Sequence, residues 1–361
     1  MSVRAAVLQE MGKPLDIEEI DLVDTQPDQV RVRIAASGVC HSDLSVVRGR
    51  LPHPTPVVLG HEGAGVVTEV GSDVTRVKVG DHVVLDWIPA CGSCAFCQRG
   101  EIHLCENAVV ATFASPYASL RGEALYRGLG TATFATETLT LEKAVVPIDP
   151  EIPLEIAALV GCAVTTGVGA ALNTAKVPAG ATVAVIGCGG VGLSVIMGAV
   201  YAGAERIIAV DLSEERRGIA KTLGATDVLD GAGADIGAEV REMTAGGVAY
   251  AFEVVGVPKT LEMAWNCTRR GGTTVAVGAG TPDEYFTLSM FDAFYHSKAL
   301  IGCVYGSANP ETDFPRFLGM WRDGKLPIDK LLTERITLDQ VNDAFAAMEA
   351  GEGARSVIIN D

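Results

Sequence analysis

The sequence predicts an α/β protein built from a β-rich domain and a second domain with a doubly wound parallel sheet. From about residue 180, short apolar strands alternate with helical segments and glycine turns, the pattern of such a sheet. The first 165 residues instead contain short alternating segments broken by glycine, proline and aspartate, which favours antiparallel strands. With 361 residues, 48% hydrophobic and 20% charged, the chain is long and apolar enough for two cores.

The parallel sheet is predicted to begin at residues 181–187, ATVAVIG, an apolar β-branched run typical of a strand buried on both faces. The turn GCGGVG and the helix VGLSVIMGAVYAG follow, and then a second strand, RIIAVD, at 206–211. Later segments repeat the alternation and bring the number of strands to about six. They are SEERRGIAKTLG and VPKTLEMAWNCTRRGG as helices, and TDVLD, GVAYAFEVVG, TTVAVGAG and KALIGCVYG as strands.

The glycine turn predicts a dinucleotide-binding site. Gly187 permits a tight turn, Gly189 lets the backbone approach a pyrophosphate, and Gly192 lets the helix pack closely on the strand. Gly190 and Val191 complete the turn, where the free N–H groups of the helix N-terminus would face the phosphates. The competing interpretation is a turn that only packs.

Asp211 favours NAD over NADP as the coenzyme. It ends the second strand, nineteen residues beyond Gly192, where a carboxylate accepts hydrogen bonds from the adenosine ribose. The same negative charge would repel the 2′-phosphate of NADP.

The β-rich domain is predicted from segments such as QVRVRIAASG and GAGVVTEVGS. From about residue 304 the chain is expected to return to this domain. LDQVNDAFAAMEAGE reads as an amphipathic helix and ARSVIIN as a closing strand.

Four of the nine cysteines, Cys91, Cys94, Cys97 and Cys105, form a C-x2-C-x2-C-x7-C run. Four thiolates at this spacing can close a tetrahedron around zinc, which is typical of a structural site. Disulfides are the alternative, but they would need an oxidising compartment, and an odd cysteine count argues against a disulfide framework.

A second metal site is predicted from Cys40, His61 and Cys162. Two thiolates and one imidazole are a known ligand set of catalytic zinc and leave one coordination position open. Taken singly, each residue has an ordinary explanation, since Cys162 reads as a small buried hydrophobe and His61 as a core histidine. Their occurrence together in a chain with a dinucleotide-binding pattern favours a metal site.

The net charge of −17 and the isoelectric point near 4.8 argue against a nucleic-acid partner, because a phosphate backbone would be repelled. The N-terminus lacks the pattern of a secretory signal, and no unbroken apolar run reaches the length of a membrane helix. We therefore expect a cytoplasmic protein with no membrane partner.

Over nearly its whole length the chain resembles the zinc-dependent alcohol dehydrogenases of the medium-chain dehydrogenase/reductase superfamily. GVCHSDLS, GHEGAGVV, CGSCAFC, GLGTATFATETLT and GCGGVG occur in the order and spacing of that family. The resemblance implies a GroES-like catalytic domain at residues 1–163 and 304–361, a Rossmann domain at 164–303, and an active site in the cleft between them. It also implies NAD, one catalytic and one structural zinc ion per chain, with the structural zinc held by the loop 91–105, and an alcohol or aldehyde substrate. The long segment between Cys105 and Cys162 is closer to the animal-type and glutathione-dependent formaldehyde dehydrogenase branches, which favours a homodimer over a tetramer.

The resemblance also assigns residues near the metal. Cys40, His61 and Cys162 match the catalytic zinc ligands, and Glu62 matches an acid close to the metal. Asp43 matches the carboxylate that orients the ligand histidine, a role that metal-site physics also predicts. Ser42 matches the hydroxyl that hands on the alcohol proton.

Four further residues match positions that contact the coenzyme or the substrate. His41 and Arg355 fall where the family contacts the coenzyme pyrophosphate, and Arg216 resembles the cation beside the adenosine ribose. Trp87 occupies a position that lines the substrate pocket, where its large ring should narrow access.

The proton relay departs from the family at Ser45. Many members end the relay at a histidine that would fall at this position, so the last step is expected to pass through water or another base. His53 is a candidate for that base, although an exposed loop histidine between prolines is the preferred interpretation.

Three functions follow from these observations. The first is an NAD-dependent dehydrogenase of primary or simple secondary alcohols. The second is a formaldehyde dehydrogenase that acts on an S-hydroxymethyl thiol adduct. The third is a non-catalytic dinucleotide-binding protein of the same fold.

Overall fold

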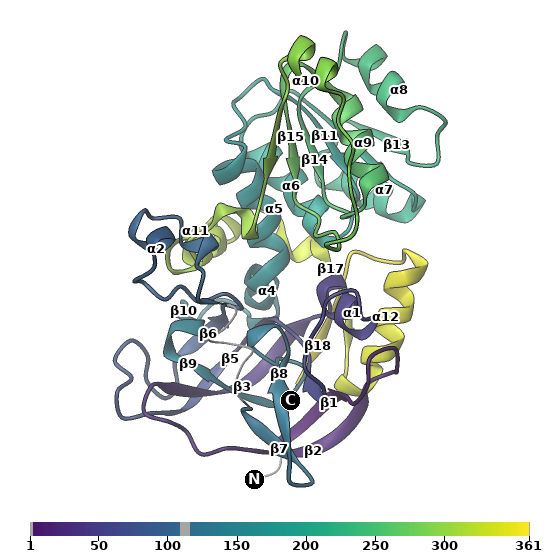
Figure 1. Cartoon of the computed structure of the whole chain (residues 1–361). Coiled ribbons are helices and arrows are strands. Elements are labelled where there is room, and N and C mark those ends of the chain that lie inside the picture. Colours follow the sequence, from purple (N-terminus) through teal and green to yellow (C-terminus); the bar gives the residue numbers. More distant parts are fainter. Residues whose placement is uncertain (1–2, 109–115, 361) are drawn as a thin grey trace.

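The computed structural model describes residues 3–108 and 116–360, and its ribbon shows a parallel sheet with helices above a β-rich part that contains both chain ends (Figure 1). Within these residues the parallel sheet has six strands in the order β13-β12-β11-β14-β15-β16. They are β13 (Asp227–Asp230), β12 (Arg206–Asp211), β11 (Thr182–Ile186), β14 (Val248–Glu253), β15 (Thr268–Ala276) and β16 (Ala299–Gly302). This confirms the predicted doubly wound sheet. The strand order reverses beside β11, the point at which open α/β sheets bind ligands.

Helices cover both faces of this sheet because successive strand residues point to opposite sides. Val183 and Val185 of β11 pack in the cluster that contains α6 (Gly190–Tyr201) and part of α7 (Glu214–Thr222). Ala184 and Ile186 pack on the other face against α8 (Ile236–Met243) and α9 (Pro258–Cys267). Both faces of the sheet are therefore buried.

Two helices of the parallel-sheet part were not predicted, α8 and α10 (Met290–His296). Both begin at a side-chain cap, since Asp235 accepts a hydrogen bond from the Ala238 N–H and Ser289 accepts one from Asp292 N–H. These caps were the missed sequence signal. The helix predicted through residue 272 ends at Cys267, and residues 268–272 belong to β15.

The β-rich part combines a closed barrel with a larger sheet. The barrel strands are β1 (Val3–Leu8), β2 (Asp16–Leu22), β7 (Ala118–Leu120), β8 (Glu123–Arg127) and β4 (Val57–Val58). The sheet strands are β10 (Val145–Pro147), β6 (His82–Leu85), β5 (Glu62–Val70), β3 (Gln29–Gly38), β18 (Arg355–Ile359) and β17 (Leu332–Ile336), with β9 (Glu137–Leu141) paired to β3. Most pairs are antiparallel as predicted, but the prediction is wrong for β4–β8 and β17–β18, which are parallel.

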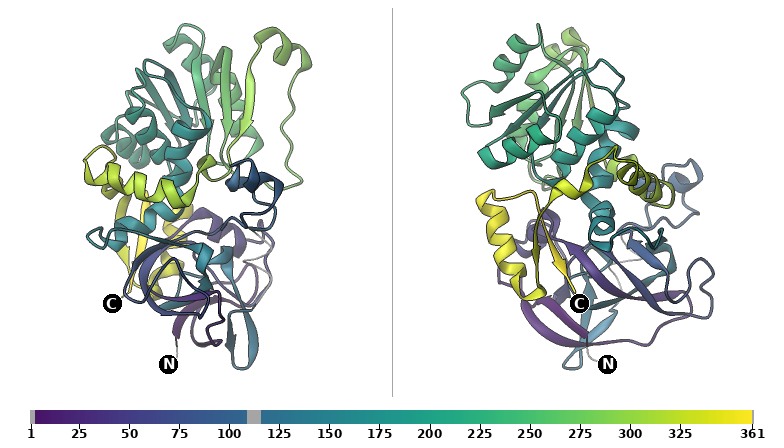
Figure 2. Two further views of the ribbon diagram at one scale, coloured as in Figure 1. Left: turned by 90° about the vertical axis from the view of Figure 1, so that its left-hand side faces the viewer. Right: turned by 180° about the vertical axis from the view of Figure 1, so that it is seen from behind.

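The C-terminal segment joins the N-terminal strands. β18 pairs antiparallel with β3, so that Val357 lies opposite Gly38. Figure 2 shows the yellow C-terminal strands and α12 (Val341–Ala350) beside the purple N-terminal strands. Another helix of this segment, α11 (Pro310–Arg322), contacts β10 and the long helix described next.

One continuous helix, Leu154–Thr174, runs from the β-rich part to the parallel-sheet part (Figure 1). It alternates between α and π geometry: α4 (Leu154–Leu159), η4 (Val160–Val164, π), α5 (Thr165–Gly169) and η5 (Ala170–Thr174, π). By length and composition this helix alone, among the residues described, could cross a membrane, but 83% of its apolar window is buried inside the fold, as in a soluble core helix. The predicted domain boundary at 163/164 lies within it, and the domain ranges stay predictions.

Candidate active site

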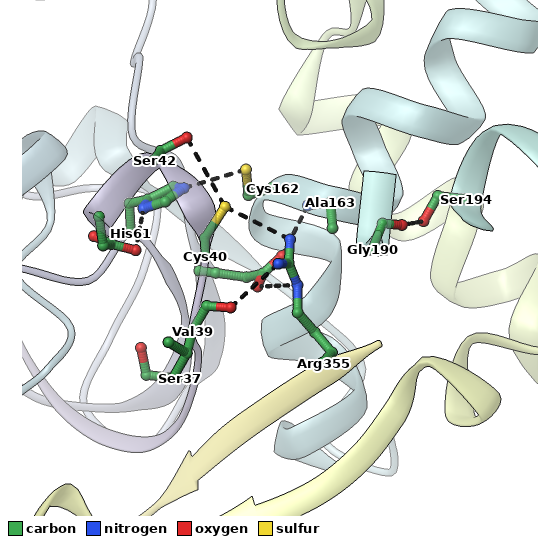
Figure 3. A network of polar contacts seen from close by, with 12 residues as sticks. Ser37, Val39, Cys40, Ser42, His61, Cys162, Ala163, Gly190, Ser194 and Arg355 are labelled. Carbon is green, nitrogen blue, oxygen red and sulfur yellow. Dashed lines mark hydrogen bonds and ion pairs between the residues drawn. The ribbon is translucent and has the colours of Figure 1, made fainter. Parts of the chain in front are cut away.

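Three elements far apart in the sequence bring Cys40, His61 and Cys162 together. Cys40 precedes α1 (His41–Val47), His61 precedes β5, and Cys162 lies in the π segment η4 of the long helix. Their donor atoms lie within 4.8 Å of one another, and His61 Nε2 is 3.2 Å from Cys162 Sγ. All three side chains are buried. Figure 3 shows the two sulfur atoms and the imidazole facing one another.

This cluster has the chemistry of a zinc site. The Asp43 carboxylate lies 3.0 Å from His61 Nδ1 and accepts a hydrogen bond of 2.8 Å from the Gly60 N–H. It therefore directs the other imidazole nitrogen, Nε2, toward the sulfurs, as carboxylates do for metal-bound histidines. The hydrogen bond with Cys162 lowers the pKa of Cys40 well below its usual value, so one sulfur is readily available as a thiolate. Three ligands leave a fourth position for substrate.

Glu62 and Arg355 form a buried ion pair behind the cluster. Arg355 Nε lies 3.1 Å from Glu62 Oε2, and the other carboxylate oxygen accepts the Ala163 N–H at 2.8 Å. The guanidinium also donates to the Val39 carbonyl at 3.2 Å and lies 3.6 Å from Cys40 Sγ. A Cβ atom at Gly38 would lie 2.0 Å from Glu62 Oε2, so this arrangement requires glycine at that position.

Arg355 also reaches the glycine turn, because a Cβ atom at Gly190 would lie 2.8 Å from its guanidinium carbon. It thus joins the metal cluster to the start of α6. Its placement fits the predicted pyrophosphate contact, although the Glu62 carboxylate already neutralises much of its charge.

The glycine turn between β11 and α6 fits a dinucleotide. Gly187 has a φ of 99°, and a Cβ atom at Gly192 would lie 1.9 Å from the Gly187 carbonyl oxygen. Both positions therefore need glycine to form the turn. A Cβ atom at Gly189, in contrast, meets no atom within 4 Å. The space above Gly189 is free for a pyrophosphate at the N-terminus of the helix.

The Asp211 carboxylate lies at this turn. It accepts hydrogen bonds from the Cys188 N–H at 2.6 Å and the Ser213 N–H at 2.8 Å. Arg216 lies on the next helix, but its guanidinium donates to the carbonyls of Gly353, at 3.0 Å, and Met348, at 3.4 Å. These bonds tie α7 to the C-terminal segment, and the predicted ribose contact of Arg216 stays a prediction.

The predicted substrate-side residues lie beside the metal cluster. The rings of Trp87 and His61 meet edge to face with centroids 6.1 Å apart, so Trp87 forms a wall next to a metal ligand. Ser42 Oγ lies 3.9 Å from Cys40 Sγ (Figure 3). His41 is exposed at the start of α1.

The expectation of an exposed His53 is wrong. Only 9% of this residue is exposed, and its Nδ1 lies 2.9 Å from the Pro54 carbonyl oxygen. The loop pairs with the barrel three residues later, where the Pro56 carbonyl accepts the Tyr126 N–H. Ser45 lies on α1, one turn beyond Ser42.

The four cysteines at 91–105 form the second cluster, with donor atoms within 4.8 Å of one another. Sulfur–sulfur distances of 3.5 Å for Cys94–Cys97 and 3.9 Å for Cys91–Cys97 and Cys94–Cys105 match the roughly 3.8 Å edge of a tetrahedron with 2.3 Å zinc–sulfur bonds. All nine cysteines of the chain are free thiols, which contradicts the disulfide alternative. The lobe formed by residues 91–105 fits a closed structural zinc site.

Asp86 is a buried acid that the sequence reasoning missed. It precedes Trp87, accepts one hydrogen bond from the Ile88 N–H at 3.1 Å, and lines a cavity of about 270 Å³. Burial, with a smaller contribution from the nearby Glu311 carboxylate, raises the pKa of Asp86 to about 7. The sequence signal that could have predicted a buried acid is the position of Asp86 directly after the apolar run VVL.

We expect Asp86→Asn to stabilise the protein more at pH 8 than at pH 5. The folded pKa lies above the ordinary value, so the folded state binds more protons than the unfolded state between about pH 4 and 7, and stability falls as pH rises through this window. Asparagine removes that penalty and keeps an acceptor for the Ile88 N–H. Thermal unfolding at both pH values measures the effect. The exposed Asp73→Asn is the matched control, and an equal shift of Asp86→Asn at both pH values would contradict the prediction.

Comparisons with known proteins agree with this site. Residues 26–150 match the family model of the alcohol dehydrogenase GroES-like domain, and residues 190–321 match that of zinc-binding dehydrogenase. The alcohol dehydrogenase class-3 of Drosophila melanogaster is 37% identical, over 99% of this chain and 97% of its own length. The S-(hydroxymethyl)glutathione dehydrogenase of Paracoccus denitrificans is 36% identical, over 99% of this chain and all of its own. The crystal structure of benzyl alcohol dehydrogenase from Acinetobacter calcoaceticus superposes with a TM-score of 0.94, at 32% identity and full coverage of both chains.

The predicted cofactors, NAD and two zinc ions per chain, agree with these family matches and with the two ligand clusters. The chain is therefore an enzyme, and the predicted fold of a GroES-like part and a Rossmann part is confirmed. Over nearly its entire length, in sequence and in structure, the chain belongs to the zinc-dependent alcohol dehydrogenases of the medium-chain dehydrogenase/reductase superfamily.

Proposed function

We propose that the enzyme oxidises primary or simple secondary alcohols with NAD and reduces the corresponding aldehydes or ketones. The observation that carries this proposal is the buried cluster of Cys40, His61 and Cys162, which offers three ligands and one open position. The cluster lies beside the Ser42 hydroxyl and is joined through Arg355 to the glycine turn. These residues would thus hold the substrate oxygen between the Ser42 hydroxyl and the coenzyme.

When bound, zinc supplies a Lewis acid that stabilises negative charge on the substrate oxygen, and NAD supplies the hydride acceptor. Ser42 Oγ would accept the proton of the alcohol hydroxyl as its own hydroxyl proton passes on to water. Asp43 fixes the imidazole of His61. Arg355, itself paired with Glu62, contacts the sulfur of Cys40. Trp87 limits the width of the substrate site and excludes water from it.

A panel of alcohols assayed by NADH absorbance tests the proposal. Linear, secondary and benzyl alcohols belong in this panel, since a relative of known structure is a benzyl alcohol dehydrogenase and Trp87 offers an aromatic wall. Turnover of at least one of these alcohols with NAD is the expected result. No turnover by protein that carries two zinc ions would contradict the proposal.

The second candidate is a formaldehyde dehydrogenase that acts on an S-hydroxymethyl thiol adduct. The similarity to the S-(hydroxymethyl)glutathione dehydrogenase of Paracoccus denitrificans favours it. Formaldehyde assayed with NAD, with and without glutathione or another low-molecular-weight thiol, separates the candidates, because only the second requires the thiol. The third possibility, a non-catalytic protein, conflicts with the complete ligand set and with the family.

We expect Asp211→Gly to lower kcat/KM for NAD about 10- to 100-fold, because the variant loses the hydrogen bonds between the ribose and one charged group. We also expect it to weaken the preference of the enzyme for NAD over NADP. The carboxylate lies at the glycine turn, fixed by two backbone N–H groups, where the adenosine ribose would bind. Steady-state kinetics with both coenzymes measure the change. Asp230→Asn, at the end of the neighbouring strand β13, is the control, and a parent enzyme that is faster with NADP would contradict the assignment.

We also propose that the enzyme is a homodimer, with a second copy bound at the edge of the parallel sheet. The edge strand β16 pairs only with β15 among the described strands, and its Leu300 is exposed. The helix α10, which contacts the neighbouring strand β15, exposes Met290 (87%), Phe291 (70%) and Phe294 (83%). An unpaired edge next to an apolar helix supports association about a two-fold axis. Light scattering of the parent and of Phe294→Glu tests this, with the dimer expected only in the parent.

A cytoplasmic location is a further proposal. Nine free thiols suit a reducing compartment. Cell fractionation tests it, and recovery in the membrane or secreted fraction would contradict it.

A further inference from the structure

Tyr305 lies directly behind the metal cluster, although it comes from the segment that leaves the parallel sheet. It begins the short helix η6 (Tyr305–Ser307), three residues after β16 ends at Gly302. Its side chain is only 3% exposed, and its hydroxyl donates a hydrogen bond to the carbonyl of Gly161. Gly161 immediately precedes the ligand Cys162 in the π segment of the long helix.

The ring of Tyr305 reaches a second ligand through Trp87. The rings of Tyr305 and Trp87 meet edge to face with centroids 5.2 Å apart, and Trp87 in turn meets His61 at 6.1 Å. On its far side, Tyr305 packs edge to face against Phe314 of α11. The tyrosine is therefore held between α11 and the wall of the substrate site.

The backbone of Tyr305 is fixed as firmly as its side chain. Its φ is 51°, a left-handed value that non-glycine residues adopt only where the surroundings impose it. The next residue, Gly306, packs so closely on the long helix that a Cβ atom there would lie 2.2 Å from the Thr165 carbonyl oxygen. Thr174 Oγ1 also lies 2.8 Å from Ser307 Oγ. The ring therefore has a defined position relative to Cys162.

We propose that Tyr305 is a positioning residue of the metal centre, whose hydroxyl fixes the Gly161–Cys162 backbone and whose ring holds Trp87 against His61. One side chain thereby sets the geometry of two of the three ligands. Burial, together with the carboxyl of Asp86 and other nearby groups, raises the pKa of Tyr305 well above its usual value, so the hydroxyl keeps the proton that it donates. The proposal depends on the three-ligand metal site and is independent of which alcohol the enzyme uses.

The test compares Tyr305→Phe with the parent enzyme, each with cobalt in the three-ligand site and zinc in the four-cysteine site. The variant removes one hydroxyl and keeps the ring. We expect the thiolate-to-cobalt absorption band to shift. We also expect a chelator to remove the cobalt faster by a factor of about 2 to 10, which corresponds to the loss of one neutral hydrogen bond. We expect kcat to fall by a similar factor, while the dissociation constant of NADH stays the same.

Tyr117→Phe is the matched control. Tyr117 is also a buried tyrosine, but its hydroxyl has no hydrogen-bond partner in the described part of the chain, and it lies in the barrel cluster. This variant should keep the cobalt spectrum and the release rate of the parent. Because the spectrum is recorded on folded, cobalt-loaded protein, a change in stability does not obscure it.

An unchanged spectrum and an unchanged release rate in Tyr305→Phe would overturn the proposal, even if kcat fell. Neither measurement requires a substrate. A failure of the proposed alcohol oxidation would therefore appear in the substrate panel and leave this test intact.

Discussion

Replacing Cys40 by alanine will abolish alcohol oxidation and leave one zinc ion per chain in place of two. The sulfur of Cys40 is one of three donor atoms that lie within 4.8 Å of one another, and two protein ligands do not hold catalytic zinc firmly. Loss of the Lewis acid should lower kcat by about four orders of magnitude or more, since it removes several kcal/mol of charge stabilisation. Metal analysis and NADH absorbance measure the two effects.

Cys267→Ala is the control for this variant. Cys267 is also a buried free thiol, but it lies at the end of α9, outside both cysteine clusters. It should keep two zinc ions and nearly full activity. The assignment fails if the parent, loaded with excess zinc, binds only one ion, or if Cys40→Ala keeps its turnover.

Replacing Cys94 by serine will remove the other zinc ion and destabilise the lobe around residues 91–105. The short helix α2 (Ala95–Gln98) buries none of its side chains among the described residues, so the lobe lacks an apolar core and depends on its metal. We expect the midpoint of thermal unfolding to fall by roughly 10 °C, a few kcal/mol in a chain of this size. We also expect rapid proteolysis within the lobe.

Differential scanning calorimetry, limited proteolysis and metal analysis check this prediction. Gln98→Ala, which alters an exposed side chain of α2 and no ligand, is the control. The residual zinc should stay in the three-ligand site, which Cys94 does not touch. A Cys94→Ser variant with two bound zinc ions and the melting temperature of the parent would contradict a structural role.

The sequence predicted best those features that depend on local spacing. The four-cysteine run closes within fifteen residues, and the glycine turn joins one strand directly to one helix. Their geometry is set by the chain itself, so a pattern of residue types is sufficient. Cys40, His61 and Cys162 were predicted from their ligand chemistry and then matched to the family, because no local rule brings residues so far apart in sequence to one point.

The partners of single side chains were harder to predict. Arg216 donates to carbonyls of the C-terminal segment, and Asp86 is buried against a segment more than 200 residues away, near Glu311. His53 is buried, and its loop is bonded to the barrel strand β8 through Pro56. Each outcome depends on which distant strand or helix lies opposite, and hydrophobic periodicity does not encode that. The contact between Tyr305 and Gly161 was missed for the same reason.

The long helix Leu154–Thr174 has a consequence for how the two parts of the enzyme move. Because it is continuous, the coenzyme-binding part can rotate on the catalytic part only if this helix bends, and its π turns are where a helix most readily deforms. Cys162 lies within the first of these turns. Points near a pivot are displaced least, so we expect the mouth of the site to open and close while the metal stays almost stationary.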